Sequence, residues 1–481
     1  MREAGGYMHC HFRIAVLTRH IRTGLVERYH ITRTEVGFDS CVVVSAKYSA
    51  TGVVLNRQTL YPALHRIVLA HPALSVQVAT GPKPNAKPRF VQLPEVNLDD
   101  VVAFAQERDY ENSIAQVLMA QLDQTFELGT ANPLWRLVVV SGRTVVFAYH
   151  HAIADGQSGL AFHAALLSIL NSPSDTTTLS GNKVTIPEDS SLVPAVESLT
   201  SISVSFGGLL SAACGAFAPQ ALTKAASSWT GNPVTQTPSV KMHVRCWEIE
   251  ASQAAELLTL CRKNGATLTG CMHTLAAGVL SRLISSNQDL RRKRFQTLCS
   301  SVPISLRRYT GASPYVLCDH VSSVRSYTSV KTLANESTSR AWFSWPVAAK
   351  FSKRIAASAK KSREVIGTMR ILFMLGISKS YFLDQLGKKR HNSFELSNLG
   401  KFPAPPEEAG EGPWSIGSVY LAQCDSVTGS AIKLNVVGSP TGSINVTFSW
   451  GQGTIDDDLA ETFIRDVKAA LFSVLESTLL S

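Results

Sequence analysis

The heptad His150–Gly156 reads HHAIADG and follows Thr144–Tyr149 (TVVFAY), a run of β-branched and aromatic residues that is typical of a buried strand. The strand therefore ends at two histidines, and Asp155 is a favourable N-cap for an apolar helix expected at Gly159–Leu170. Successive residues of a strand point to opposite faces, so we expect only one of the two histidines to enter a cavity beyond the strand.

Histidine suits proton transfer because its ordinary pKa, about 6.5, lies near neutral pH, and a well-placed general base contributes roughly 10² to 10⁴ in rate. From the residues alone, Asp155 either orients His151, as the acidic member of a triad does, or only caps the helix. The alternative for the whole heptad is a pair of core histidines without catalytic function. A serine hydrolase is disfavoured, because residues 156–160 (GQSGL) depart from Gly-x-Ser-x-Gly at the last position.

Strands and helices are expected on both sides of the heptad. Hydrophobic patterning predicts helices at Gln58–His71, Asp99–Phe104, Ile114–Leu122, Ser252–Lys263, Leu268–Ser285 and Asp457–Leu475. It predicts strands at Val42–Val44, Leu74–Val78, Trp135–Val140, Thr144–His150, Val244–Ile249, Gln296–Ile304, Gly417–Leu421, Ile432–Val437 and Ile444–Trp450, and a loop at Gly81–Pro94. Each half of the chain therefore mixes strands with helices, which indicates a mixed α/β fold.

Residues 171 to about 240 are rich in Ser, Thr, Gly and Pro and differ in composition from both flanks. The 481 residues allow two to four domains of roughly 100–200 residues each. We expect an N-terminal part at 1–180, a crossover linker at 181–240 and a C-terminal part at 241–481.

Composition excludes several classes of protein. Hydrophobic residues make up 45% and charged residues 17% of the chain, which argues against a disordered, collagen-like or coiled-coil protein. The net charge is +10, and basic runs at 291–294, 350–363 and 388–390 suit either phosphate groups or a solvated surface. Aromatic residues do not alternate with these runs, so we expect no nucleic acid partner.

The cysteines and the terminus point to the inside of the cell. The nine Cys include no Cys-x-x-Cys pair and indicate buried thiols in a reducing compartment. We expect no metal site, because His9-Cys10-His11 lacks a second ligand pair at a zinc spacing. The apolar run Ile14–Leu17 is too short for a signal peptide, so we expect a cytoplasmic protein.

Residues 198–223 form one uncharged stretch that is diluted by Ser, Gly, Gln and Pro219. This stretch leaves open a weak peripheral contact of the protein with the endoplasmic reticulum or with lipid droplets. A non-enzymatic scaffold or membrane-associated binding protein would use this stretch together with the C-terminal helix. Under that alternative, changing His151 has no effect on what the protein does.

The heptad resembles the His-His-x-x-x-Asp-Gly signature of chloramphenicol acetyltransferase-like proteins, plant BAHD acyltransferases, peptide-synthetase condensation domains and fungal alcohol acetyltransferases. Further segments follow in the family's order: Val302–Arg307 (VPISLR), Ser397–Gly400 (SNLG) and Ser449–Gly451 (SWG). His71-Pro72 with its preceding helix and Ser228–Gly231 (SWTG) are most similar to the fungal alcohol acetyltransferases. The resemblance covers about Glu27 to Leu475, although SWGQG at 449–453 departs from the Asp-Phe-Gly-Trp-Gly of the plant branch.

The resemblance implies two chloramphenicol acetyltransferase-like α/β halves with an active-site tunnel between them. It implies direct transfer of an acetyl or other short acyl group from acyl-CoA to the hydroxyl of an alcohol or secondary metabolite, with His151 as the general base. Acetyl-CoA is then a co-substrate, no cofactor stays bound, and we expect a monomer. The alternative within the superfamily is a condensation-type enzyme that takes its acyl group from a carrier protein.

The resemblance also assigns supporting residues. It implies that Asp155 forms a structural ion pair with Arg307, that His150 supports the motif, and that Gly156 leaves room for the thioester. Removing one member of a buried ion pair costs roughly 3 to 5 kcal/mol. The oxyanion or substrate contacts are expected among Ser397, Asn398, Ser449 and Trp450.

Overall fold

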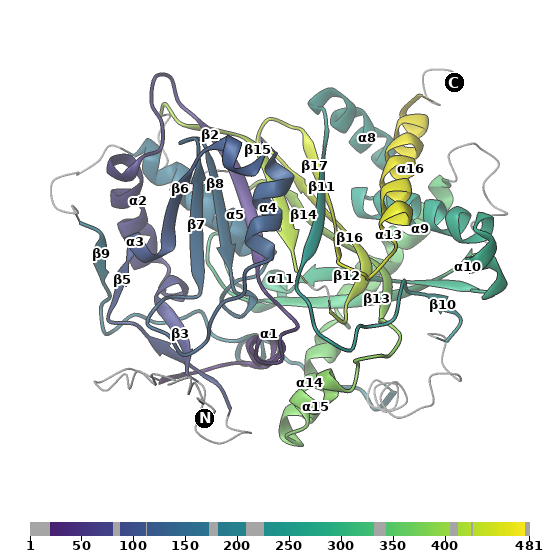
Figure 1. The fold of residues 1–481 in the computed structure, drawn as a ribbon, viewed down its shortest axis with the longest axis horizontal. Helices are drawn as coiled ribbons and strands as arrows, with labels where there is room; N and C mark the ends of the chain where they lie inside the picture. Colours follow the sequence, from purple (N-terminus) through teal and green to yellow (C-terminus); the bar gives the residue numbers. More distant parts are fainter. Residues whose placement is uncertain are drawn as a thin grey trace, which may run out of the picture.

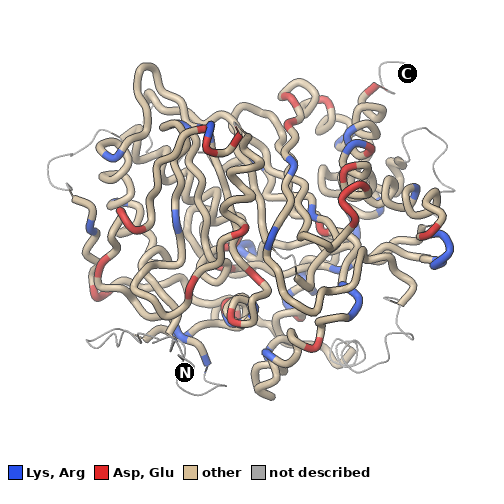
Figure 2. The backbone as a smooth tube through the Cα atoms, viewed as in Figure 1, with Lys and Arg blue, Asp and Glu red and all other residues tan. Residues whose placement is uncertain are grey.

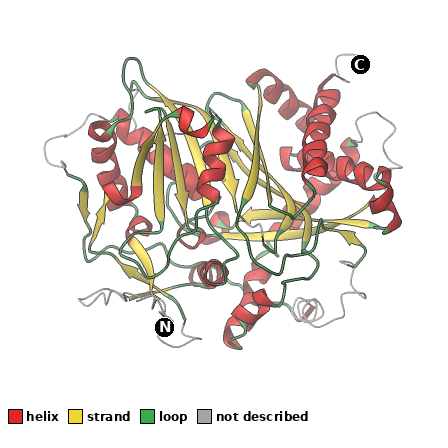
Figure 3. Ribbon diagram, viewed as in Figure 1, coloured by secondary structure: helices red, strands yellow, loops and turns green. Residues whose placement is uncertain are grey.

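The computed structural model describes residues 20–79, 87–111, 113–172, 181–207, 226–330, 343–404, 412–424 and 427–476. Two large sheets stand next to each other, one built mainly from the N-terminal half and one from the C-terminal half (Figure 1). Helices cover both sheets, so the expectation of a mixed α/β fold is confirmed (Figure 3).

The N-terminal sheet has the strand order β15-β2-β8-β7-β6. Its strands are β15 (Ser415–Gln423), β2 (Val42–Ser49), β8 (Thr144–Tyr149), β7 (Trp135–Val140) and β6 (Val102–Ala105). Helices α2 (Arg57–Ala70) and α5 (Gly156–Asn171) pack on one face, and α4 (Ile114–Leu122) packs on the other. Because both faces are covered, the central strands are continuous apolar runs rather than alternating ones.

Three local predictions in this half need correction. The helix expected at Asp99–Phe104 is only one turn, α3 (Leu98–Val101), because the next residues form β6 and pair in parallel with β7. The loop expected at Gly81–Pro94 contains β4 (Arg89–Gln92), which pairs with β1 (His20–Arg22) and β3 (Val76–Ala79). The strand expected from Leu74 begins only with β3, after the 3-10 turn η1 (Pro72–Ser75).

The C-terminal sheet has the order β10-β12-β14-β16-β17-β11, and β13 pairs with β12. Its strands are β10 (Ser228–Trp229), β12 (Thr297–Ser305), β14 (Asn392–Lys401), β16 (Ser430–Gly438), β17 (Ile444–Gly451), β11 (Met242–Ile249) and β13 (Val321–Ser329). Helix α9 (Leu268–Ser286) packs against α8 (Ala251–Lys263), α13 (Trp345–Ala359), α16 (Asp457–Glu476) and β14. These helices lie on the side of the sheet away from the N-terminal half (Figure 1).

Strand pairing crosses the predicted boundaries at three places. β15 leaves the C-terminal half and pairs with β2. Within the predicted linker, β9 (Lys183–Thr185) pairs with β5 (Glu95–Asn97), while β10 pairs with β12. The linker is thus fixed to both halves, and the division at 180 and 240 remains a prediction.

Helix α1 (Leu25–Glu35) lies where the two halves meet. The Glu197 carboxylate accepts a hydrogen bond from the Leu25 backbone N–H at 2.8 Å, which satisfies one of the free donors at the helix start. The helix packs against the 3-10 turn η3 (His151–Ile153) and against α14 (Arg363–Met374) and α15 (Ser378–Leu383). Because it has neighbours on several sides, α1 lacks the single apolar stripe that periodicity detects.

The charged residues, the cysteines and the hydropathy of the helices can be described for the residues that the structure covers. Acidic and basic residues are interspersed along the chain (Figure 2). In the described part, the cysteines are free thiols and no helix is both long enough and apolar enough to cross a bilayer. His9-Cys10-His11 and residues 208–223 lie outside the described residues.

Candidate active site

A cavity of about 300 Å³ lies between the two halves. The N-terminal half contributes α1 and the turn η3 to its wall, and the C-terminal half contributes strands β12, β13, β14 and β16. The heptad lies at this boundary because β8 ends at Tyr149 and the chain turns immediately into η3. The sequence therefore places the second histidine on the cavity wall.

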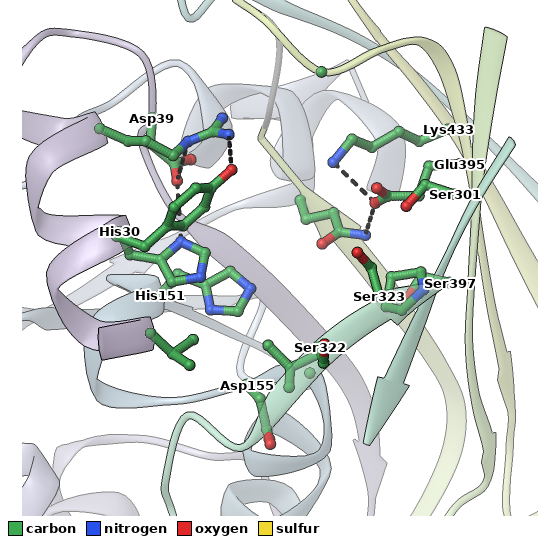
Figure 4. A pocket seen from close by; sticks show the side chains of 18 of the residues that line it. His30, Asp39, His151, Asp155, Ser301, Ser322, Ser323, Glu395, Ser397 and Lys433 are labelled. Carbon is green, nitrogen blue, oxygen red and sulfur yellow. Dashed lines mark hydrogen bonds and ion pairs between the residues drawn. The ribbon is translucent and has the colours of Figure 1, made fainter. Parts of the chain in front are cut away.

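His151 lines the cavity, and its side chain is 17% exposed (Figure 4). Its Nδ1 lies 3.6 Å from Oδ1 of Asp319, a carboxylate that is completely buried. This separation exceeds hydrogen-bond length, so the contact is electrostatic. With Nδ1 facing Asp319, Nε2 is the ring nitrogen left for a substrate.

The ring of His30, from α1, stacks on the ring of His151. The two centroids are 3.8 Å apart and the planes differ by 4°. His30 Nε2 lies 3.6 Å from Oδ2 of Asp319, so one carboxylate faces both histidines. On the other side of the ring, His30 Nδ1 lies 3.5 Å from Oδ2 of Asp39, which is paired in turn with Arg33.

The two stacked histidines differ in proton affinity. Burial is the largest single influence and opposes protonation of His151, but the charge and contact of Asp319 and the charge of Asp39 together outweigh it and raise the pKa of His151 above its ordinary value. Burial lowers the pKa of His30, and a charge on the neighbouring His151 lowers it further. The pair therefore takes up its first proton at His151, as a general base in the cavity requires.

His30, His151 and Asp319 together offer possible metal-ligand atoms that lie within 4.8 Å of one another. However, the nitrogen lone pairs lie in the planes of the rings, and parallel stacked rings direct them along separate planes. No single ion can lie in both planes, so this geometry favours a shared carboxylate over a shared metal.

His150 points away from the cavity into the N-terminal half. Its Nδ1 accepts a hydrogen bond from the Ala152 backbone N–H at 3.0 Å, and its Nε2 lies 2.8 Å from the Thr34 hydroxyl. Burial lowers the pKa of His150 to about 3, so the ring is neutral. Its contacts fix the turn that carries His151.

Asp155 does not contact His151, which corrects the reading of Asp155 as the orienting member of a triad. Its carboxylate lies 2.9 Å from Arg307 Nη2 and accepts a hydrogen bond from the Ser158 backbone N–H at 2.8 Å. It is also the N-cap of α5, which begins at Gly156. Burial alone would raise the pKa of Asp155, but Arg307 holds it below its ordinary value.

Gly156 lines the cavity where the two halves touch. A Cβ at this position would stand 2.7 Å from Cδ2 of Leu399, so a side chain would push into the opposite wall. The neighbouring Gln157 donates a hydrogen bond to the Leu399 backbone carbonyl at 2.7 Å. The turn is thereby joined to β14.

The four predicted oxyanion or substrate contacts separate into two pairs. Ser397 and Asn398 line the cavity, whereas Ser449 and Trp450 are not part of its lining. The Trp450 indole N–H donates to Asp457 at 2.8 Å, and Ser449 is completely buried within β17. Asn398 donates to Thr269 and accepts from the Gly400 backbone N–H, while the Ser397 hydroxyl makes no hydrogen bond with a described residue.

Sequence reasoning missed His30, Asp39 and Asp319. His30 belongs to a helix without an apolar stripe, and Asp319 lies between β12 and β13 in no recognisable motif. No spacing rule separates these acids from the 36 Asp and Glu residues of the chain. Tertiary contacts identify them: η3 packs on α1, Asp319 faces both His30 and His151, and Asp39 faces His30.

Comparison with known proteins relates almost the whole chain to one family. Residues 22–475 match the model of the alcohol acetyltransferase family. The chain is 26% identical to a probable alcohol acetyltransferase, crmB, of Aspergillus fumigatus, over 94% of this chain and 98% of that protein. It is 25% identical to a probable alcohol acetyltransferase, FCK4, of Fusarium pseudograminearum, over 86% of this chain and 85% of the relative.

Solved structures share the fold. The TRI3 trichothecene 15-O-acetyltransferase from Fusarium sporotrichioides superposes with a TM-score of 0.66 at 12% identity, covering 94% of each chain. The condensation domain of the Monacolin K polyketide synthase MokA superposes with a TM-score of 0.60 at 11% identity, covering 96% of this chain and 98% of the domain. These similarities confirm the expected two-part acyltransferase fold, and the match to the family model shows that the chain belongs to the alcohol acetyltransferase family.

Proposed function

We propose that the protein transfers an acetyl or other short acyl group from acyl-CoA to the hydroxyl of an alcohol or secondary metabolite, with His151 as the general base. The observation that carries the proposal is the His151 ring on the cavity wall, with Nδ1 turned to the buried Asp319. A carboxylate behind the base stabilises the imidazolium that forms when the base takes a proton.

The acyl group passes directly from the thioester to the acceptor, without an acyl-enzyme. The acceptor hydroxyl gives its proton to His151 Nε2 while its oxygen attacks the thioester carbonyl carbon. The tetrahedral intermediate then collapses, the carbon–sulfur bond breaks, and the proton on His151 passes to the departing sulfur. The products are the ester and free CoA, so the base returns to its neutral form.

The oxyanion of the intermediate needs a hydrogen-bond donor, a contribution worth about 3 to 4 kcal/mol in enzymes where one donor was removed. Of the four side chains expected from the sequence, Ser397 suits this role best, because its hydroxyl lines the cavity and has no partner among the described residues. Asn398 has both ends of its amide engaged. We therefore assign the donor to Ser397.

The CoA phosphates require positive charge near the entrance. Arg325 on β13 lines the cavity and is exposed, whereas the basic runs at 291–294 and 350–363 contribute nothing to the lining. In the third run, Arg390 is buried and donates to backbone carbonyls of Asn232 and Val427. We therefore propose that Arg325 receives a phosphate of CoA, since Arg33 and Lys433, the other basic side chains of the lining, are paired with Asp39 and Glu395.

The experiment that tests the function uses purified protein and a panel of primary alcohols, sterols and hydroxylated terpenoids. Each acceptor is offered acetyl-CoA in one arm and an acetylated carrier protein in the other, and ester and released thiol are both measured. Ester formed from acetyl-CoA, with one thiol per ester, supports the proposal. Ester formed only from the carrier protein would contradict the CoA donor and favour the condensation-type alternative.

A further inference from the structure

A row of polar side chains crosses the cavity wall formed by the C-terminal sheet. The strand registers pair Arg325 with Ser301, Ser301 with Glu395, and Glu395 with Lys433, so four adjacent strands each contribute one residue. All four residues line the cavity. Ser301, Glu395 and Lys433 lie on the wall across from His151 (Figure 4).

The inner end of this row is an ion pair. Lys433 Nζ lies 3.1 Å from Oε1 of Glu395, and the two side chains are 5% and 12% exposed. The Gln423 amide donates to the same carboxylate oxygen at 3.3 Å and to Asn435 Oδ1 at 2.8 Å. Withdrawing a pair of charges from water is costly, and a wall that contacts only hydrocarbon would be served better by apolar side chains.

Serine hydroxyls without a hydrogen-bond partner among the described residues lie in and beside this row of polar side chains. Ser301 and Ser323 line the cavity, and in the described part of the chain their hydroxyls form no hydrogen bond. They come from the neighbouring strands β12 and β13. A hydroxyl both donates and accepts, so these groups suit a ligand that has several hydroxyl or carbonyl oxygens.

We propose that the acceptor is an uncharged, multiply oxygenated molecule, in which a second oxygen, remote from the acylated hydroxyl, binds the Glu395–Lys433 pair. This inference rests on the proposed function and specifies its substrate class. The charges of Glu395 and Lys433 cancel, so the pair does not favour an ionised ligand. Lys433 and Gln423 both contact Oε1 of Glu395, and its second carboxylate oxygen, which accepts no hydrogen bond from a described residue, is the acceptor offered to a ligand hydroxyl. A site of this kind rejects an analogue that lacks the matching group, because its own polar atoms are left unpaired.

The place of the Glu395–Lys433 pair in the cavity indicates that it binds the acceptor rather than the acyl donor. The row runs from the exposed Arg325 to the buried Lys433, and the nucleotide of CoA is too large for a cavity of about 300 Å³ that also holds the acceptor. The acyl donor thus enters from the exposed side, and its acyl carbon lies near His151. The wall across from His151 is left for the rest of the acceptor.

The test compares rigid diols with alcohols of the same carbon skeleton that lack the second hydroxyl, at saturating acetyl-CoA. The series varies the distance between the two hydroxyls. We expect kcat/KM for the best diol to exceed that of its matched mono-alcohol by about 10- to 100-fold. Equal values, or a preference for mono-alcohols in every pair, would overturn the inference while leaving the acyltransferase function standing. Absence of ester from every acceptor would overturn both.

A double variant, Glu395→Leu with Lys433→Met, removes both charges together and so leaves no unpaired charge in the wall. We expect the ratio of diol to mono-alcohol to fall towards 1. The matched control is Glu95→Leu with Lys183→Met, a surface ion pair with side chains 47% and 57% exposed, which should keep the wild-type ratio. If the cavity variant keeps the ratio but raises the KM for acetyl-CoA, the row serves the donor and the inference is wrong.

Discussion

His151 and Asp319 meet where the two halves of the chain join, with Nδ1 of the ring 3.6 Å from Oδ1 of a carboxylate that has no exposed surface. The histidine belongs to the N-terminal half and the aspartate to the C-terminal half. The electrostatics of the base therefore depend on how the halves pack. Asp155, which the motif itself supplies, is engaged with Arg307 instead.

Replacing Asp319 with Asn should change the pH dependence of the reaction as well as its rate. The base must be neutral to accept a proton, so the rate falls as the pH falls through the pKa of His151. Because Asp319 raises that pKa, its loss should move the acid limb of kcat/KM to lower pH. We also expect the plateau rate to fall by about 10- to 100-fold, since the imidazolium loses its counter-charge. An acid limb that stays in place would show that Asp319 does not act on His151.

Two replacements of His30 distinguish the effect of its ring stacking on His151 from the effect of its charge contact with Asp319. His30→Phe keeps a flat ring against His151, whereas His30→Ala leaves a gap beside it. We expect the alanine variant to lose more activity, up to about 10²-fold, because a misplaced base is no longer aligned with the substrate. Rates measured well above the acid limb remove the effect of protonation. Equal losses in the two variants would point to the contact of His30 with Asp319 in place of the stack.

The Asp155–Arg307 pair should act mainly on stability. The side chains are 3% and 8% exposed, so Asp155→Ala strands a buried guanidinium and should cost about 3 to 5 kcal/mol in unfolding free energy. The double variant Asp155→Leu with Arg307→Met should lower the unfolding free energy less than Asp155→Ala or Arg307→Met alone. Urea unfolding of these three variants checks this order. An Asp155→Ala protein that is as stable as the wild type, with only slower turnover, would contradict the structural role.

Glu27 should make the protein less stable as the pH rises. Burial, reinforced by Asp319 and Glu197, raises the pKa of Glu27 to about 8 from an ordinary value of 4.5. Between these values the unfolded chain releases a proton that the folded chain keeps, so stability falls by up to about 1.4 kcal/mol per pH unit and then levels off. Glu27→Gln removes this loss, and its melting temperature should exceed the wild-type value increasingly from pH 5 to pH 8.

The exposed Glu188 provides the matched control for that measurement. A Glu188→Gln variant should follow the wild-type melting curve at every pH. A constant difference between Glu27→Gln and the wild type across this range would mean that Glu27 is already ionised in the folded protein.

Much of the architecture could be predicted from the sequence, because valine-rich runs and apolar helices carry strong local signals. The strand predicted at Thr144–His150 ends one residue earlier, at Tyr149, and the cap at Asp155 and the helix behind it follow from residue types alone. The helix predicted at Asp99–Phe104 is wrong because residues from Val102 onward adopt an extended strand that pairs in parallel with β7, although their local pattern favours a helix. Asp319 and His30 could not be predicted as site residues, because their place in the site depends on contacts between segments that are distant in the sequence.

The proposed role of His151 is to take the proton of the alcohol during direct acyl transfer. Mass spectrometry of ester formation from acetyl-CoA and the alcohol panel tests this role, with wild type, His151→Ala and His243→Ala compared. His243 stacks on Trp450 outside the cavity lining and serves as the control. Folded His151→Ala should lose about 10² to 10⁴ in rate, while His243→Ala should keep the wild-type rate. Ester formation by His151→Ala at the wild-type rate would contradict this role.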